Sequence, residues 1–455
     1  MAARVPAIRK TAVPPGPRGR LAANVIRFRR DPLELFTSVA HEYGDVAHLR
    51  LGSEHLYLVS HPDLVREVLL TQGQSFMKGR ALQEAKRLLG EGLLTSEGEL
   101  HRRRRRLIQP LFHHERIAAY GAIMAEYAAR ACERWEEGQT VDMAREMQRL
   151  TLAVVAKTLF DADVESEAED VREALTSVLE MFDRFLLPFA GLLERLPLPA
   201  TRRFHRARDR LDAIIFRMLE ERRDGGGGDD LLSLLLLARD EEGGGAGMSD
   251  VQIRDEAMTL FLAGHETTAL ALTWTWYLLA QNPEVEARLH AELDALPEEH
   301  LPGAEDLRRL EYARMTLAES MRLYPPAWAI GRRALEDVAI GEYVIPTGSL
   351  VVVSQYVTHR DPRWFPEPER FDPERFTPEA EAARPRYAYF PFGAGSRLCI
   401  GERFAWMEGV LVLATIARRW RARLDPAQRV ELSPLVTLRP KHGMRVVLER
   451  RPAPE

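Results

Sequence analysis

Hydrophobic residues recur about every 3.6 positions through the middle of the chain, which is the period of helices packed into a core. The pattern is strong between residues 115 and 223, and the run from Leu150 to Leu159 is typical of it. It predicts several buried helices. Glycine runs at 225–228 and 243–247 bracket a short apolar helix predicted over 231–238.

A longer helix is predicted from Ser249 to Gln281, just before Asn282-Pro283. Ser249 and Gln252 match a capping box, and Met248 with Ile253 matches a hydrophobic staple, so its start is well marked. About 33 residues at 1.5 Å each give a length of ~50 Å. A helix of that length crosses a whole domain.

Alternating and β-branched runs predict a few short strands. Val46–Leu51 and Leu56–Val59 flank Gly52-Ser53 as a hairpin, and a helix opens at His61-Pro62-Asp63. Residues 344–353 are predicted to form a second hairpin, and residues 430–447 short strands. The leucine-rich stretch 76–98 is predicted to be loop-like. The expected fold class is therefore mainly α with small β-sheets (α+β).

Composition supports one large globular unit spanning residues 1–455, since no linker divides the chain. Hydrophobic residues make up 45%, and 63 basic against 68 acidic residues give a net charge of −5. Near-balanced charge predicts no nucleic-acid partner. Residues 1–20 are basic and proline-rich but lack an apolar run, so no membrane anchor or span is expected. Two cysteines give no disulfide framework, and a cytoplasmic location is predicted.

The clearest candidate for a functional site is the glycine-rich loop around Cys399. Gly393, Gly395 and Gly401 allow positive φ angles or close approach, and helix-forming residues follow directly, so the thiol is predicted to lie at a helix N-terminus as a thiolate. No base lies nearby for a nucleophile, and a single cysteine cannot build a zinc or iron–sulfur site. One thiolate does suffice as the axial ligand of a haem. The alternative is a buried structural cysteine.

The pattern Phe392-x-x-Gly395-x-Arg397-x-Cys399-x-Gly401 resembles the haem-binding signature of the cytochrome P450 family. The resemblance implies a haem b (iron protoporphyrin IX) held between a long central helix and the cysteine loop. Cys399 would be the metal ligand, and Phe392 would contact the cofactor. Without an anchor, the chain resembles the bacterial members.

The middle of the long helix breaks the apolar pattern at Ala263-Gly264-His265-Glu266-Thr267-Thr268. A helix bend without chemistry is one interpretation, because threonine hydroxyls bond back to preceding carbonyls. The resemblance implies instead a groove for O₂ at Gly264 and an acid–alcohol pair, Glu266 and Thr267, as the catalytic residues. A hydroxyl that holds water and an acid linked to solvent would deliver protons.

Basic residues in three places match the propionate-binding positions of the family. His101 and Arg105 lie four apart in the helix that carries the run Arg102–Arg106, and Arg332 and Arg397 follow later. A solvated charged face or a strand edge is the plain alternative for these arginines. Glu319, Arg322 and Arg375 match a buried structural triad of the family. Residues 182–198 resemble its mobile lid over the substrate channel, and a buried connection is the alternative for this segment.

The resemblance implies a monooxygenase (EC 1.14 type) that takes two electrons with O₂ and hydroxylates or epoxidises an apolar substrate. Fatty acids, terpenoids, steroids and polyketides all qualify; Phe182, Phe185 and Trp328 indicate only an apolar pocket. Electrons would come from NAD(P)H through a reductase and an acidic ferredoxin or flavodoxin. That partner would dock on Arg102, Arg103, Arg106 and Arg403. A peroxide-driven peroxygenase and a haem gas sensor are the alternatives.

Overall fold

The computed structural model describes residues 13–17, 21–162, 199–225, 228, 230–239, 245, 247–297 and 300–452. The chain forms two compact units, each assembled from separate stretches. Unit 1 comprises Met1–Arg80, Ala327–Arg370 and Pro378–Cys399, and unit 2 comprises Ala81–Pro326, Phe371–Thr377 and Ile400–Glu455. That residues 1–455 act as one domain stays a prediction.

Unit 1 is built on a five-stranded sheet with the order β1-β2-β8-β5-β3. These strands are β1 (Val46–Leu51), β2 (Glu54–Val59), β8 (Leu350–Val353), β5 (Ile330–Ala334) and β3 (Phe76–Lys78). β1 and β2 are antiparallel around Gly52, whose φ is +63°, which confirms the first predicted hairpin. β2 pairs in parallel with β8.

The second predicted hairpin, over 344–353, is wrong. β7 (Tyr343–Ile345) pairs with β6 (Val338–Ile340) in a separate two-stranded sheet, whereas β8 joins the large sheet. A turn between them, closed by a hydrogen bond from the Ser349 N–H to the Pro346 carbonyl and with Gly348 at φ +81°, carries the chain from one sheet to the other. Local alternation marked the strands correctly, but it cannot identify their partners.

Unit 1 also contains short helices, of which α1 and α2 pack on β1. They are α1 (Leu21–Arg30), α2 (Pro32–Tyr43), α3 (Pro62–Arg66), η1 (Glu67–Thr71), η2 (Gly73–Ser75), α16 (Gln355–Thr358), α17 (Pro378–Ala383), η6 (Arg386–Ala388) and η7 (Gly395–Arg397). α3 starts where predicted, with the His61 ring accepting from the Asp63 N–H. The apolar core of this unit joins Val59 and Phe76 to Phe390 and Ala394 from the cysteine loop. The loop is therefore anchored on the sheet's core.

Unit 2 carries the long helices. They are α5 (Lys86–Leu89), α6 (Gly98–Ile108), η3 (Gln109–Phe112), α7 (His114–Glu133), α8 (Met143–Phe160), α11 (Pro199–Asp224), α12 (Leu231–Leu237), α13 (Asp250–Leu279), α14 (Pro283–Asp294), η4 (Ala304–Arg308), α15 (Glu311–Leu323), η5 (Pro373–Phe376) and α18 (Glu402–Ala417). α4 (Arg80–Glu84) begins at the boundary of the two units. The loop predicted over 76–98 is wrong, because β3, α4 and α5 occupy much of it.

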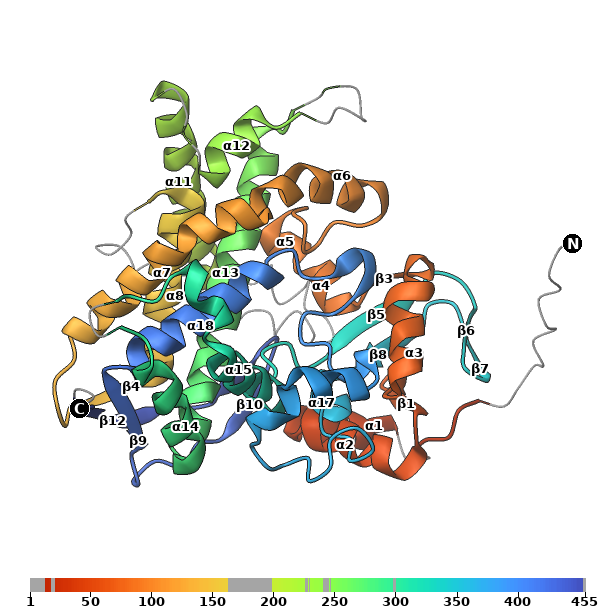
Figure 1. Cartoon of the computed structure of the whole chain (residues 1–455). Coiled ribbons are helices and arrows are strands. Elements are labelled where there is room, and N and C mark those ends of the chain that lie inside the picture. Colours follow the sequence, from red (N-terminus) through yellow and green to blue (C-terminus); the bar gives the residue numbers. More distant parts are fainter. Residues whose placement is uncertain are drawn as a thin grey trace, which may run out of the picture. The chain divides into compact units, whose positions relative to one another are not determined.

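The predicted long helix is α13, with 30 residues, and its capping box between Ser249 and Gln252 is present. It packs along α8 (Figure 1). The two helices approach closely at Gly264, where an added Cβ would lie 3.1 Å from a methyl carbon of Val155. Close packing therefore gives this glycine a structural reason independent of any groove for O₂.

Two small sheets complete unit 2, as predicted for the tail. β4 (Thr140–Asp142), β12 (Arg445–Arg450) and β9 (Trp420–Leu424) form one, and the hairpin of β10 (Leu432–Pro434) and β11 (Leu438–Pro440) forms the other. The Trp274 indole N–H donates to the Leu438 carbonyl at 2.9 Å, which ties β11 to α13. Among the described helices, none is both long and apolar enough to cross a bilayer. The predicted lid, 182–198, with Phe182 and Phe185, lies outside the described residues.

Candidate functional site

The cysteine loop has the tight backbone that its glycines predict. Gly393 and Gly395 have φ angles of +73° and +71°, and a Cβ on Gly395 would lie 2.2 Å from the Leu69 carbonyl oxygen. The Cys399 N–H donates to the Phe392 carbonyl at 3.0 Å, which closes the loop. Gly401 differs: its φ is −88°, which any residue adopts, and it is the N-cap of α18.

A histidine that the sequence did not single out anchors this loop. His359 is fully buried, and its Nε2 accepts from the Phe390 N–H at 3.0 Å. Its ring also packs against Tyr389 and Phe390. No local pattern predicted this role, because the histidine lies 31 positions before its partner in an irregular segment.

The two cysteines have opposite environments. Cys132 is buried in α7, and burial raises the pKa of its thiol to about 12, so it stays protonated and unreactive. Cys399 is exposed on its loop. Because Cys399 is exposed, it is not a buried structural cysteine. An exposed thiol on a glycine loop is suited to act as a metal ligand.

The other predicted cofactor contacts of unit 1 lie on the loop and in β5. Arg397 donates from Nη2 to the Phe76 carbonyl at 3.3 Å, and both Arg397 and Phe392 are half-buried. Arg332 is buried in β5 and donates from Nη1 to the Gly331 carbonyl at 3.2 Å. Burial excludes a solvated strand edge for Arg332. Trp328 packs against Phe36 of α2, with ring centroids 5.9 Å apart.

In unit 2, α13 is buried from Ile253 to Leu262 and again from Thr268 to Trp276, with one less buried turn between these stretches. Ala263 is exposed, and Gly264 and Thr267 are half-buried, between flanking stretches that are mostly buried. Ala263 and Thr267 lie four apart and share a face. The Thr267 hydroxyl donates to the Ala263 carbonyl at 2.9 Å, the back-bond that threonine favours in helices. We call this less buried turn of α13, with its small residues and the Thr267 hydroxyl, the opening.

Glu266 points away from that opening. It is 2% exposed, and its Oε1 lies 2.8 Å from Nε of Arg439 in β11. Within the described residues, no hydrogen bond joins Glu266 to Thr267, since neighbouring helix positions face different directions. The predicted acid and alcohol are adjacent in sequence but have separate partners in the structure.

α6 carries the predicted pair His101 and Arg105 on one face, with His101 buried and Arg105 half-buried. The alternative of a solvated charged face does not hold for the whole arginine run. Arg104 is 3% exposed, and its Nε lies 3.5 Å from Glu256 of α13. Helical periodicity explains this correction, because one side of any core helix faces inward whatever residues it carries.

The predicted structural triad is confirmed within unit 2. Arg322 donates to both carboxylate oxygens of Glu319, at 2.6 and 2.7 Å, and Arg375 approaches Glu319 at 3.5 Å. The Asp372 N–H also donates to Glu319, at 2.9 Å. These residues have a structural role rather than a catalytic one.

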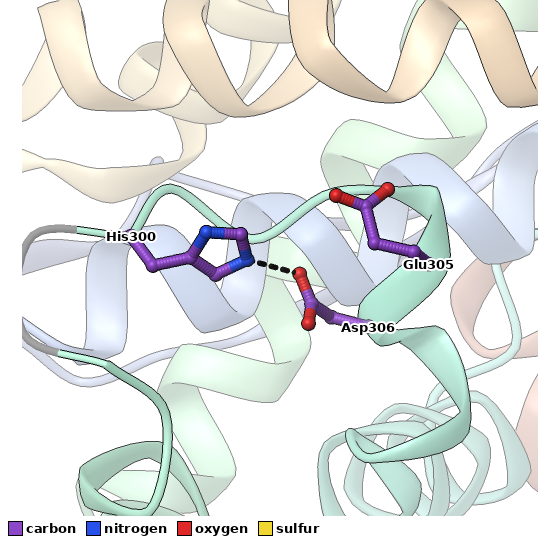
Figure 2. A group of neighbouring side chains, drawn as sticks. All are labelled: His300, Glu305 and Asp306. Carbon is purple, nitrogen blue, oxygen red and sulfur yellow. Dashed lines mark hydrogen bonds and ion pairs between the residues drawn. The ribbon is translucent and has the colours of Figure 1, made fainter.

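A separate polar cluster precedes α15. His300, Glu305 and Asp306 lie together, and the His300 ring points toward Asp306 (Figure 2). They line a cavity of about 300 Å³ together with Arg309. Asp306 Oδ2 accepts from the His300 ring at 2.6 Å and from the Gly303 N–H at 2.9 Å. Arg418 of α18 donates to the carbonyls of Pro297 and His300. These contacts fasten a loop, and the Arg309 guanidinium that lines the same cavity disfavours a bound metal ion.

An exposed thiol on a glycine loop and a hydroxyl-bearing opening in a buried helix fit a protein with a thiolate-ligated haem. The comparisons agree. The family model described as cytochrome P450 matches residues 14–446. The chain is 41% identical to the cyclooctat-9-en-7-ol 5-monooxygenase of Streptomyces melanosporofaciens, over 91% of this chain and 90% of that protein. It is 36% identical to the pentalenene oxygenase of Streptomyces avermitilis, over 93% and 94%.

The fold agrees as well. A crystal structure of the cytochrome P450DA heme domain matches with a TM-score of 0.87 and 29% identity, covering 98% of this chain and 99% of that one. The chain belongs to the cytochrome P450 family. It is accordingly a monooxygenase, an oxidoreductase of the haem-thiolate class.

Proposed function

We propose that this P450 hydroxylates or epoxidises a cyclic terpenoid, with O₂ and two electrons from separate redox proteins. The observation that carries the substrate class is the similarity, over nine-tenths of the chain, to two enzymes named for a cyclooctatenol and for pentalenene. Fatty acids, steroids and polyketides, which the sequence left open, have no comparable support among these relatives.

Cys399 is the residue that would ligate the iron of haem b. Bound haem supplies the activation of O₂, and a thiolate ligand favours O–O cleavage. We assign His101, Arg105, Arg332 and Arg397 to the propionates, because each is a cation or donor that is buried or half-buried rather than free in solvent.

On α13, Thr267 would hold water with its hydroxyl, and Glu266 would supply protons to it. Phe392 and Gly264 would contact the macrocycle, and the missing side chain of Gly264 would leave room for O₂ beside it. The 3.1 Å approach of Val155 gives the glycine at position 264 a packing role as well.

Electrons would come from NAD(P)H through a reductase and an acidic ferredoxin or flavodoxin. Arg102, Arg106 and Arg403 are exposed in unit 2 and suit an acidic partner. The fourth predicted docking residue, Arg103, is half-buried and donates to the Gly247 carbonyl at 3.3 Å. Reduced cysteines, with neither Cys132 nor Cys399 in a disulfide, agree with a cytoplasmic location.

The test compares wild type with Cys399→Ser and, as the matched control, Cys132→Ser. Wild type and the control are expected to give the red-shifted Soret band of a thiolate–haem–CO complex, and Cys399→Ser to lose it. A band that survives in Cys399→Ser would overturn the ligand assignment. A screen of cyclic terpenes, fatty acids and steroids for spin-state shifts tests the substrate class.

The same preparation separates the alternatives. Turnover with peroxide but none with a ferredoxin and its reductase would select the peroxygenase. Binding of CO with no spin-state shift and no product from any substrate class would select the gas sensor. Product formed from a terpene with NAD(P)H and the redox proteins is the outcome that we expect.

A further inference from the structure

The segment of unit 1 that contacts the cysteine loop is the π-helix η1, which continues α3 by one wide turn. The Gln72 N–H donates to the Glu67 carbonyl at 2.9 Å, five residues back, whereas an α-helix bonds four residues back. A π-turn of this kind is rare and is often found at functional sites. The reason for it should lie in what the turn contacts.

One side of η1 lies directly against the cysteine loop. A Cβ on Gly395 would lie 2.2 Å from the Leu69 carbonyl oxygen, so only a glycine allows this approach. The Leu69 side chain is buried in the same apolar core as Phe390 and Ala394 of the loop. Cys399 follows four residues after Gly395 and closes the loop with its own N–H. A shift of η1 is therefore transmitted to the backbone that presents the thiol.

Two side chains tie the ends of η1 to the β6–β7 hairpin. Glu67, its first residue, accepts from the Gly341 N–H at 3.1 Å, and Gln72, just after it, donates to the Ala339 carbonyl at 2.6 Å. The hairpin lies beside α3 (Figure 1), and a Cβ on Gly341 would be 3.2 Å from Leu64 of that helix. These contacts join positions 274 and 267 residues apart, so no local pattern predicts them.

The hairpin is a firm support for η1, whereas η1 is weak by itself. Ile340 of β6 and Ile345 of β7 are fully buried, in the same apolar cluster as Leu69. A helical segment of five residues is unstable alone, because nucleation costs more than so few hydrogen bonds return. The shape of the π-turn therefore depends on its contacts with the hairpin and the core.

We propose that Glu67 and Gln72 are positioning residues for the thiol that ligates the haem. They hold η1 on the β6–β7 hairpin, the Leu69 backbone holds the loop at Gly395, and the loop presents Cys399. This inference rests on the proposed function, since it assumes that Cys399 binds the iron. It adds a support for the ligand that lies outside the glycine-rich loop itself.

The experiment compares wild type with Glu67→Ala, Gln72→Ala, the double variant of these two and Glu67→Gln. The last is conservative, because its amide oxygen can still accept from the Gly341 N–H. Glu336→Ala is the matched control. Glu336 accepts from the Ser75 hydroxyl at 2.6 Å and so joins η2, rather than η1, to the segment before β6.

The first readout is hydrogen exchange of residues 393–399 in the purified full-length protein, which needs no turnover. Loss of one ordinary hydrogen bond should speed exchange there about fivefold, and the double variant should exceed either single variant. Exchange in the β1–β2 hairpin is expected to stay at the wild-type rate in every variant, which separates local loosening of the loop from unfolding of the unit.

The second readout is spectroscopic, on the haem-loaded protein. It is the rate at which the CO complex loses the red-shifted Soret band of the thiolate. Changes behind a metal ligand are expected to cost about tenfold, so the double variant should lose the band about tenfold faster than wild type. Glu67→Gln and Glu336→Ala should both stay near the wild-type rate.

Wild-type exchange of residues 393–399 in the double variant would overturn the proposal. So would a control, Glu336→Ala, that matches the double variant in both readouts, because the effect would then be a general loosening of unit 1. If the double variant does not fold, Gln72→Ala decides: a wild-type rate of band loss in it would reject the role. A wild type without any thiolate band would overturn the proposed function, and the exchange result would still test the contact between η1 and the loop.

Discussion

Glu319 and Arg322 form a two-pronged ion pair one turn apart in α15, and neither side chain is exposed to solvent (0% for both). The i,i+3 spacing alone would give a pair worth a few tenths of a kcal/mol on a helix surface. Burial changes its importance, because the Glu319 carboxylate is the counter-charge of Arg322 and, at 3.5 Å, of Arg375 as well.

Replacing Glu319 by Gln should therefore lower the free energy of unfolding by about 3–5 kcal/mol, because two arginines lose their shared carboxylate. Urea unfolding followed by circular dichroism measures the change. The control is Glu99→Gln, which breaks the exposed i,i+3 pair with Arg102 and should cost less than about 1 kcal/mol. Equal costs for the two variants would contradict the structural role of the triad.

Glu408 of α18 predicts a specific dependence of stability on pH. Burial raises its pKa to about 8 from 4.5, and the Thr268 hydroxyl offsets this only in part. Between those values the folded protein holds a proton that the unfolded chain has lost, so stability from this group is complete below pH 4.5 and declines as pH rises toward 8. The slope is at most about 1.4 kcal/mol per pH unit.

The variant Glu408→Gln should remove this slope, because the amide resembles the protonated acid. Its free energy of unfolding should exceed that of wild type at pH 8 and approach it near pH 4.5. Urea titrations at several pH values provide the measurement, with exposed Glu284→Gln on α14 as the control that keeps the wild-type slope. A wild-type slope in Glu408→Gln would show that this carboxyl is not the source.

Two glycines with similar positive φ angles allow the cost of backbone strain to be measured separately from the cost of steric crowding. Gly348 and Gly395 have φ angles of +81° and +71°, but an added Cβ meets nothing within 4 Å at Gly348, and lies 2.2 Å from a backbone oxygen at Gly395. Gly348→Ala should cost about 1 kcal/mol. Gly395→Ala should cost several times more and reduce haem retention, measured as the ratio of Soret to protein absorbance. Similar costs would mean that the cysteine loop moves aside freely.

Reduction by an acidic ferredoxin should depend on the exposed arginines of unit 2. Glu99 lies 2.7 Å from Arg102 and 3.8 Å from Arg106 and so neutralises part of that charge. Glu99→Gln should raise the rate of reduction, and Arg403→Gln should lower it, each by a few-fold at low salt and less at high salt. Stopped-flow reduction under CO measures both. Rates indifferent to ionic strength would exclude an electrostatically guided partner.

The sequence predicted the helices best where the local pattern was strongest. The capping box at Ser249 and the apolar period fixed the start and length of α13, and the Glu319-x-x-Arg322 spacing placed its pair on one helix. The prediction failed where partners lie far along the chain: the strands 343–345 and 350–353 join different sheets. Arg104 also looked like part of a solvated run, but it is paired inside with Glu256.

The sequence by itself determined which groups the chain offers: a thiol framed by glycines and a glutamate–threonine pair inside an apolar helix are local features. Their interpretation as a haem ligand and a proton relay came from the resemblance to the cytochrome P450 family. The tertiary structure decided the partners of those groups. It placed Arg439 on Glu266 across 173 positions of sequence, His359 beneath the cysteine loop and Val155 against Gly264. Such contacts depend on how separate elements pack, and packing is a property of the whole fold rather than of any stretch of chain.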